Sequence, residues 1–423
     1  MLYSEFSQEQ LLIEKEQLQK RYDEFKAQNL SLDMSRGKPS PLQLDLSMDV
    51  LGEVDLCENF RASNGFDCRN YGVLDGIPEC KKLFAELLEV DEKNIIIGGN
   101  SSLTLMFDYI SQCMTHGAGK EAWLKQGDIK FICPVPGYDR HFGILEHFGI
   151  EMINVDMLSD GPDMDKVNEL IKDRSVKGMI LVPKYSNPEG ITLSDECVRK
   201  IAAMKPAAED FRVIWDNAYC IHDINDTHDE LLNVFEAAKE YSSEDMFIEV
   251  TSTSKISFPG AGVSALAASD KNIEMIKKRM TVQTIGNDKL NQLRHVMYFK
   301  NLDGIKNHMK KHAESLKPKF DAVIRCFTEE FSGTGIASWK NPNGGYFISL
   351  NVLEGCAKRT GELCKEAGVV LTTPGATYPY GKDPKDTNIR IAPSFPCVEE
   401  LETAAELLCV SARLAACEKL LKR

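Results

Sequence analysis

The chain has 423 residues, 43% of them hydrophobic, and its formal net charge at pH 7 is -14. This length exceeds the usual size of one compact unit, so we expect two domains. The acidic charge argues against nucleic acid or an anionic membrane as a general partner, and no apolar run approaches the roughly 20 residues of a membrane-spanning helix.

The first third of the chain predicts a helix, two loops and an anion-binding turn. A charged amphipathic helix covers roughly residues 8–28. Prolines and glycines then mark loops at residues 34–41 and 71–78. Residues 94–103 (NIIIGGNSSL) predict a strand, a glycine turn and the start of a helix. Free backbone NH groups and the helix dipole make such a turn a ready site for an anion.

Polar residues follow two apolar runs in the middle of the chain. Residues 178–183 and 211–215 predict buried strands, and Asn187 and Asp216 come after them. A carboxylate at the carboxyl end of a strand faces the crevice of an open α/β sheet, where Asp216 could pair with the protonated ring nitrogen of pyridoxal phosphate. Tyr219 could reach the phenolate oxygen of the same ring. The alternatives are a helix cap or turn for Asp216 and an ordinary turn for Asn187.

Lys255 follows the strand-like run 246–250 inside a turn rich in hydroxyl groups, which include those of Ser252 and Ser254. An amine that condenses with an aldehyde has to be held at a rigid strand end and kept partly desolvated so that it can deprotonate. The neighbouring hydroxyls can hold an anionic group. The alternative is a solvated surface lysine. With Asp216 upstream, we interpret Lys255 as a reactive amine.

The last part of the chain has a different pattern. From about residue 300 it predicts a long helix, strand-like runs at 345–350 and 369–375, a short strand around Arg390 and a closing helix from about residue 398. The arginine suits bidentate capture of a planar carboxylate, and it is costly to bury without a partner. The alternative for Arg390 is a structural salt bridge to an Asp or Glu.

The order of these elements predicts an α/β protein. Strand-like runs alternate with helical patterns from residue 95 to 266, which favours a mostly parallel sheet covered by helices. We expect a large cofactor-binding domain over residues 61–300. Both chain ends, residues 1–60 with 301–423, then form a smaller α+β domain.

The succession of Asn187-Pro188, Asp216-x-x-Tyr219, Ser-x-Lys255 and the late Arg390 resembles that of fold-type I aminotransferases, over nearly the whole chain. These enzymes use pyridoxal phosphate. The resemblance implies that Lys255 forms a Schiff base with the cofactor and that Asp216 contacts the pyridine nitrogen. It also implies that Asn187 and Tyr219 contact the phenolate oxygen and that Arg390 binds the α-carboxylate of the substrate.

The same resemblance implies the remaining contacts. Tyr138 would stack on the pyridine ring, and Gly37 would lie beside the substrate. Tyr71 would reach the phosphate of the neighbouring subunit, which implies a homodimer with shared active sites. Taken alone, these residues are a turn tyrosine, part of a Pro/Gly loop and a loop aromatic. The implied phosphate contacts come from Gly99, Asn100, Ser101, Ser102, Ser252 and Ser254.

The chain departs from the family pattern in one place. The family often carries a phosphate-binding arginine several residues past the Schiff-base lysine, and residues 259–264 contain none. We therefore expect backbone NH groups and hydroxyls, or a distant Lys or Arg, to hold the phosphate.

Residues 37–47 and 284–292 are most similar to a divergent group of aspartate aminotransferases, related to the aminotransferase-like half of certain bacterial regulators. This similarity implies aspartate and 2-oxoglutarate as substrates. Two alternatives of the same fold are a β-eliminating lyase and an aromatic aminotransferase. A non-catalytic ligand-sensing regulator is less favoured, because the first ~60 residues leave little room for a DNA-binding domain. A second substrate carboxylate needs a second cation, and the candidates are Arg36, Lys38, Lys289 and Arg294.

The cysteines and histidines give no pattern typical of disulfides or of a metal site. The 13 cysteines are scattered without a C-x-x-C pair, so we expect free thiols and a cytoplasmic protein. The N-terminus carries no apolar stretch of the kind found in secretory signals. The eight histidines, among them His141, show no spacing typical of metal ligands, so we expect packed or hydrogen-bonded side chains and no metal.

Overall fold

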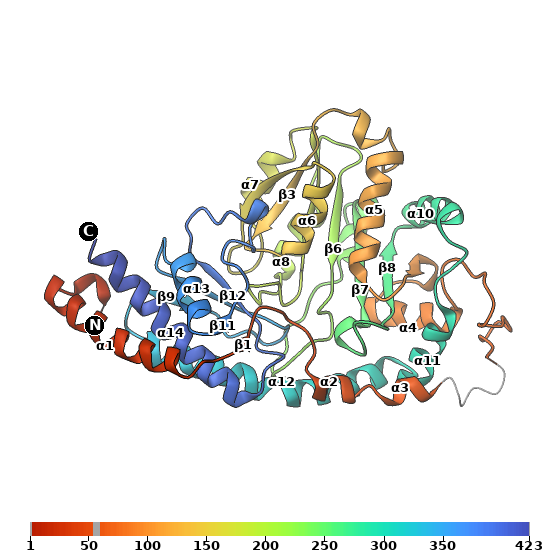
Figure 1. The fold of residues 1–423 in the computed structure, drawn as a ribbon. Helices are drawn as coiled ribbons and strands as arrows, with labels where there is room; N and C mark the ends of the chain where they lie inside the picture. The colour runs from red at the N-terminus through yellow and green to blue at the C-terminus, as the bar shows by residue number, and fades with distance from the viewer. Residues whose placement is uncertain (1, 54–59, 423) are drawn as a thin grey trace.

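A seven-stranded sheet forms the centre of the chain in a computed structural model, which describes residues 2–53 and 60–422 (Figure 1). The strand order is β2-β8-β7-β6-β5-β3-β4. Strand β8 is antiparallel to β2 and β7, and the other neighbours are parallel. The strands are β2 (Ile95–Ile97), β3 (Lys130–Val135), β4 (Glu151–Asp156), β5 (Val176–Leu181), β6 (Arg212–Asp216), β7 (Phe247–Ser252) and β8 (Ser264–Ala268).

Helices cover both faces of this sheet, as the sequence predicts. Side chains alternate between the two faces of a strand, so a strand covered on both sides needs apolar residues at successive positions. In β5, Met179 and Leu181 join the core on one face, and Ile180 joins the core on the other. The covering helices are α4 (Pro78–Leu88), α7 (Met164–Leu170), α8 (Asp195–Ala202), α9 (Val234–Lys239) and α11 (Lys289–Phe299) on the first face, and α5 (Ser102–His116), α6 (Asp139–His147) and α10 (Asp270–Gln283) on the second.

A smaller α+β unit packs beside the large sheet and is built from both ends of the chain (Figure 1). Its antiparallel sheet has the order β12-β10-β9, and β1 from the N-terminal segment pairs in parallel with β11. The division between residues 60 and 61 and between 300 and 301 stays a prediction. Its elements are β1 (Leu32–Asp33), β9 (Ala337–Trp339), β10 (Ile348–Val352), β11 (Val369–Val370), β12 (Asn388–Ile391), α1 (Gln8–Ala27), α12 (Leu302–Phe331), α13 (Ala357–Glu366) and α14 (Val398–Leu420). Two short helices connect the units: α2 (Pro41–Asp45) contacts α12, and α3 (Asp49–Gly52) contacts α11.

Two strand-like runs are shorter in the structure than in the prediction. The run at 345–350 becomes a strand only from Ile348, because Gly345 has a φ of +85° and interrupts extended pairing. The run at 369–375 pairs only over β11, and Gly375 with φ +95° ends it in a turn. None of the helices in residues 2–53 and 60–422 combines the length and the hydropathy needed to cross a bilayer.

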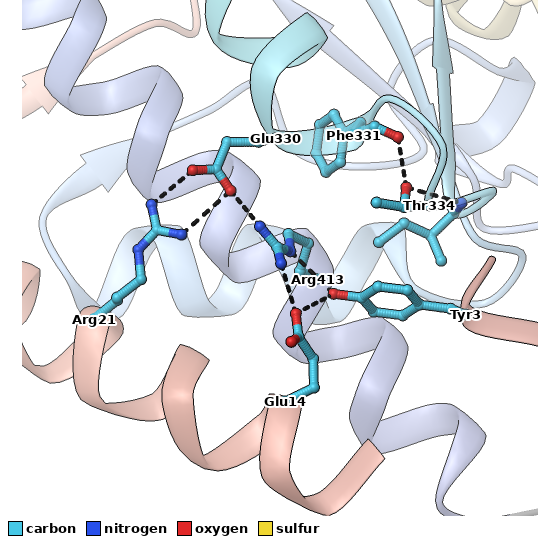
Figure 2. Close-up of polar contacts among 8 residues, drawn as sticks. Tyr3, Glu14, Arg21, Glu330, Phe331, Thr334 and Arg413 are labelled. Carbon is cyan, nitrogen blue, oxygen red and sulfur yellow. Dashed lines mark hydrogen bonds and ion pairs between the residues drawn. The ribbon is translucent and has the colours of Figure 1, made fainter. Parts of the chain in front are cut away.

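Helix α1 is fastened to α12 and α14 by a cluster of charged and hydroxyl groups (Figure 2). Arg413 of α14 donates to Glu14 at 2.6 Å and to the Tyr3 hydroxyl at 2.9 Å, and it also pairs with Glu330 of α12. Arg21 of α1 donates to both carboxylate oxygens of Glu330, at 2.7 and 3.2 Å. These contacts hold α1 against α12 and α14, while the pairing of β1 with β11 holds the start of the loop at residues 34–41.

Candidate active site

The carboxyl ends of β5, β6 and β7 bring three of the predicted site residues to one edge of the sheet. Asp216 is the last residue of β6, Lys255 ends a 3-10 turn directly after β7, and Asn187 follows β5. These strands are parallel neighbours, so their carboxyl ends open onto the same crevice. Tyr219 lies in the turn after β6, and its ring centroid is 5.0 Å from Lys255 Nζ.

Asp216 has one bonded and one free carboxylate oxygen. His141 Nε2 lies 2.9 Å from Asp216 Oδ2, and both side chains are buried. Within the described part of the chain, Oδ1 of Asp216 is buried and has no hydrogen-bond partner. Because a buried carboxylate oxygen without a partner is costly, this atom is suited to accept a hydrogen bond from a bound group. The protonated ring nitrogen of pyridoxal phosphate fits that requirement.

The surroundings of Lys255 favour its neutral form. Desolvation lowers the pKa of the Lys255 amine, and the Asp216 carboxylate acts in the opposite direction. The rings of Tyr219 and Tyr346 face the amine, the second at 5.9 Å. Burial raises the pKa of Tyr219 well above its usual range, so its phenol keeps a proton at neutral pH and can donate a hydrogen bond.

The predicted anion site lies at the start of α5, and the turn after β7 contacts it. Ser101 caps α5 and accepts a hydrogen bond from the NH of Leu103 at 3.2 Å. Ser254 Oγ donates to the carbonyl of Asn100 at 3.0 Å, and Ser252 Oγ donates to Ser254 Oγ at 2.9 Å. The structure thus joins two segments that are about 150 residues apart, and it gathers hydroxyls beside the free NH groups of a helix start. Gly99 is exposed and Ser102 is the first residue of the helix.

Tyr138 lies at the amino end of α6, beside the residue that bonds Asp216. Its ring centroid is 5.0 Å from that of His141, and the two planes meet at 74°. Burial raises the pKa of the Tyr138 phenol to about 12. A half-buried ring in this position is available for stacking on a planar ligand above Asp216.

Arg390 on β12 is buried and lies close to Asn187. Its Nη1 donates to Asn187 Oδ1 at 3.2 Å and to Asp139 Oδ1 at 2.7 Å. The guanidinium carbon lies 4.9 Å from the centroid of the Phe347 ring. A Cβ atom on Gly37 would lie 2.4 Å from Phe347 Cζ, so any other residue there would force the Phe347 ring to shift. The Phe347 ring is therefore close to both Gly37 and Arg390.

Tyr71 occupies an exposed turn. Its side chain is 75% exposed, and the NH of Gly72 donates to the carbonyl of Ile285 at 3.2 Å. The predicted role of Tyr71 concerns a neighbouring subunit and stays a prediction.

The four candidates for a second carboxylate-binding cation fall into two pairs. Arg36 and Lys38 are exposed and flank Gly37, and Lys38 Nζ lies 3.8 Å from the centroid of the Phe395 ring. Lys289 and Arg294 both lie on α11. Lys289 is buried and donates to the carbonyl of Asn287 at 3.1 Å, whereas Arg294 Nε donates to Asn291 at 2.7 Å.

Comparison with known proteins decides the family. The profile described as aspartate amino-transferase matches residues 6–423. The chain belongs to the aspartate aminotransferase family. An aspartate aminotransferase of Corynebacterium glutamicum is 44% identical over 419 residues, which cover 98% of this chain and 96% of its own. The structure of an aspartate transaminase from the same species has a TM-score of 0.97 at 43% identity and covers 99% of both chains.

A more distant structure has the same fold. An α-aminoadipate aminotransferase of Thermus thermophilus, complexed with N-(5'-phosphopyridoxyl)-L-leucine, has a TM-score of 0.73 at 17% identity and covers 93% of both chains. Membership of the aspartate aminotransferase family makes this chain a transaminase, with amino acids and keto acids as its substrate classes. The family also implies pyridoxal phosphate as the cofactor. The resemblance to fold-type I aminotransferases is confirmed.

Sequence reasoning missed three residues of this candidate site. Asp139 directly follows Tyr138 and begins α6. In the sequence it looks like any acidic residue in the first turn of a helix, so nothing indicates a second role. Phe347 and Tyr346 lie in a predicted strand, where aromatic residues normally indicate core packing. The described residues contain no group of three or more His, Cys, Asp or Glu side chains arranged to hold a metal ion.

Proposed function

We propose that the chain is a pyridoxal-phosphate-dependent aspartate aminotransferase that moves the amino group of aspartate to 2-oxoglutarate. One observation carries the cofactor assignment: beside the desolvated Lys255, Asp216 has a buried oxygen that finds no hydrogen-bond partner among the described residues. The names of the relatives from Corynebacterium glutamicum support the choice of aspartate. Pyridoxal phosphate, when bound, draws electrons from the α-carbon of an attached amino acid and so makes its proton acidic.

The chain's own residues divide the work of holding the cofactor. Asp216 accepts a hydrogen bond from the ring nitrogen and stabilises its proton, while His141 holds the other carboxylate oxygen. Asn187 and the protonated Tyr219 stabilise the phenolate oxygen, and Tyr138 stacks on the ring. The phosphate binds at the start of α5, with contacts from Gly99, Asn100, Ser101, Ser102, Ser252 and Ser254.

Lys255 has two tasks in this proposal. It would hold the cofactor through its amine, and the same amine, once released, would remove the proton from the substrate α-carbon. A lowered pKa supports both tasks, because the neutral amine is the nucleophile and the base. The first product, a keto acid, leaves before the second substrate binds, so parallel double-reciprocal lines are expected.

Arg390 binds the α-carboxylate of the substrate. Its planar guanidinium is held between Asn187 and the Phe347 ring, which leaves it little freedom to move. For the second carboxylate of aspartate we favour Arg36 and Lys38 over the two cations on α11. Both flank Gly37, which contacts the Phe347 ring beneath Arg390.

We also propose a homodimer in which Tyr71 reaches the phosphate of the partner subunit. Three large apolar or aromatic side chains support an interface here: Tyr71, Val282 and Ile285 are 75%, 88% and 62% exposed. A hydrogen bond between Gly72 and Ile285 places these segments side by side. Such a group of exposed apolar side chains is typical of a protein contact surface. Sedimentation at micromolar concentration should give twice the monomer mass.

The replacement Lys255→Ala tests the cofactor and the chemistry together. We expect the purified variant to lose both the visible absorption of covalently bound cofactor and its transamination activity, with an unchanged circular dichroism spectrum. The solvent-exposed lysine replacement Lys271→Ala should retain both signals. Normal turnover by the Lys255 variant would show that the catalytic assignment is wrong.

Half-reactions separate the candidate activities. Aspartate should aminate the cofactor stoichiometrically and release oxaloacetate. Amination by tyrosine at a higher rate would favour an aromatic aminotransferase. A β-eliminating lyase would instead release ammonia and pyruvate from a cysteine conjugate without aminating the cofactor. Steady turnover with any amino donor excludes a purely ligand-sensing regulator.

A further inference from the structure

Arg390 already holds a carboxylate in this structure. Its Nη1 donates to Asp139 Oδ1 at 2.7 Å and to Asn187 Oδ1 at 3.2 Å, and its Nε lies 3.4 Å from Thr372 Oγ1. A substrate carboxylate that binds in the bidentate manner needs two NH groups of the same guanidinium. Asp139 therefore occupies part of the position at which a substrate carboxylate has to bind.

Among these partners, Asp139 is the one that can leave. Asn187 is 4% exposed and the Arg390 side chain 7% exposed, whereas the side chain of Asp139 is 33% exposed. Asp139 is also the first residue of α6, where free NH groups and the helix dipole stabilise an acidic side chain. Its carboxylate thus has a favourable environment even when it is not bonded to Arg390.

We propose that Asp139 is a displaceable internal carboxylate that competes with the substrate for Arg390 and so sets the affinity of the enzyme for carboxylates. The inference rests on the proposed function, in which Arg390 binds the α-carboxylate. In the free enzyme Asp139 neutralises a buried guanidinium, which would be costly to leave unpaired. When substrate binds, its carboxylate replaces Asp139 at Nη1 and Asp139 turns toward solvent.

The displacement of Asp139 decides which anions occupy Arg390 at a given concentration. Any anion that binds Nη1 of Arg390 has to displace Asp139. A small monoanion such as acetate gains little else from the site, whereas a substrate gains further contacts that offset the displacement. Displacing Asp139 weakens the binding of every such anion by the same factor, so a small anion falls below useful affinity while a substrate with further contacts still binds.

Succinate, a dicarboxylate without an amino group, is a suitable probe. Its dissociation constant for the cofactor-loaded enzyme can be measured by calorimetry without turnover. We expect Asp139→Ser to bind succinate about fivefold more tightly, since a partly exposed ion pair contributes about 1 kcal/mol. Asp139→Asn should shift binding in the same direction, although the amide keeps an oxygen that can accept from Arg390. KM for the amino acid and for the keto acid should fall by similar factors, because both carry the same α-carboxylate.

Two further variants separate the possible outcomes. Asp195→Asn changes an exposed aspartate that is also the first residue of its helix, α8, and should leave succinate binding unchanged. Arg390→Gln should weaken succinate binding at least tenfold. If it does so while both Asp139 variants bind succinate no more tightly than the native enzyme, the competition is wrong and the role of Arg390 stands. If Arg390→Gln binds succinate normally, the carboxylate site itself is misassigned. Thermal unfolding of each variant shows whether it is folded.

Discussion

His141 Nε2 lies 2.9 Å from Asp216 Oδ2, and this single contact defines which oxygen of the carboxylate remains available. The second oxygen is buried without a partner in the described part of the chain. A carboxylate held in this way can stabilise a proton on a bound ring without rotating to find its partner. Helix α6, which carries His141, also begins next to Tyr138, so one helix positions both the orienting histidine and the candidate stacking ring.

Replacement of Asp216 by asparagine should therefore be costly even though the shape is conserved. The amide lacks the negative charge that keeps a proton on the ring nitrogen. Because a hydrogen bond to a charged group contributes about 1.5–3 kcal/mol, we expect kcat/KM to fall by about 10- to 150-fold. Steady-state transamination assays measure this loss, and fluorescence titration measures cofactor affinity. Native kinetics in the variant would contradict the proposed role of Asp216.

Gly37→Ala tests whether the packing beneath Arg390 controls catalysis. The added Cβ would lie 2.4 Å from Phe347 Cζ, so the ring has to move, and with it the guanidinium that covers it at 4.9 Å. Since small displacements of positioning groups reduce rates strongly, we expect kcat/KM to fall by about ten- to a hundredfold. The control is Gly143→Ala within α6, where the new Cβ meets no atom within 4 Å and activity should be retained. Equal activity of the two variants would contradict this role.

The sequence predicted the parts of this site that depend on local order along the chain. Asp216 and Lys255 directly follow strands whose apolar pattern is clear, and the carboxyl ends of parallel strands meet at one edge. The glycine turn before α5 could be predicted for the same reason, because it directly follows the apolar strand β2. A polar residue after a buried strand is informative because the strand itself can be read from the sequence.

The parts that were missed depend on contacts between distant segments. Asp139 and Arg390 are 251 residues apart, and no local pattern indicates that they pair. The sequence allowed either a carboxylate-binding arginine or a structural ion pair at position 390. The structure shows an ion pair in the free chain, and the proposed displacement of Asp139 makes the two interpretations compatible.

Glu249 should make stability depend on pH. It is buried on β7, accepts a hydrogen bond from Asn217 at 2.8 Å, and has its pKa raised from 4.5 to about 8 by burial. Between these values the folded chain binds a proton that the unfolded chain releases. The contribution of Glu249 to the free energy of unfolding is therefore fully present below pH 4.5 and is lost as the pH rises to about 8. When the pKa of a group differs by one between the folded and the unfolded chain, the group changes the free energy of unfolding by up to about 1.4 kcal/mol.

The variant Glu249→Gln keeps the hydrogen bond and cannot ionise. We expect its unfolding temperature to match that of the native chain near pH 5 and to exceed it increasingly toward pH 8. Differential scanning calorimetry across this range measures the difference. Glu121→Gln, on an exposed loop, is the matched control and should show no such trend. Parallel pH profiles for the native chain and the Glu249 variant would show that Glu249 is not the titrating group.

Arg413 should contribute to stability far more than a surface arginine. It donates to Glu14 and Tyr3, pairs with Glu330, and is 19% exposed (Figure 2). Arg413→Met removes the positive charge between the partly buried carboxylates of Glu14 and Glu330. Because the two carboxylates then lack this partner, we expect the free energy of unfolding to fall by about 3 kcal/mol. Urea denaturation measures the change, and limited proteolysis should show earlier cleavage near α1, because α1 loses a main attachment to α14. The control, Arg325→Met, breaks an exposed pair with Glu402 and should cost less than about 1 kcal/mol. Equal losses in the two variants would mean that the cluster is no stronger than an ordinary surface ion pair.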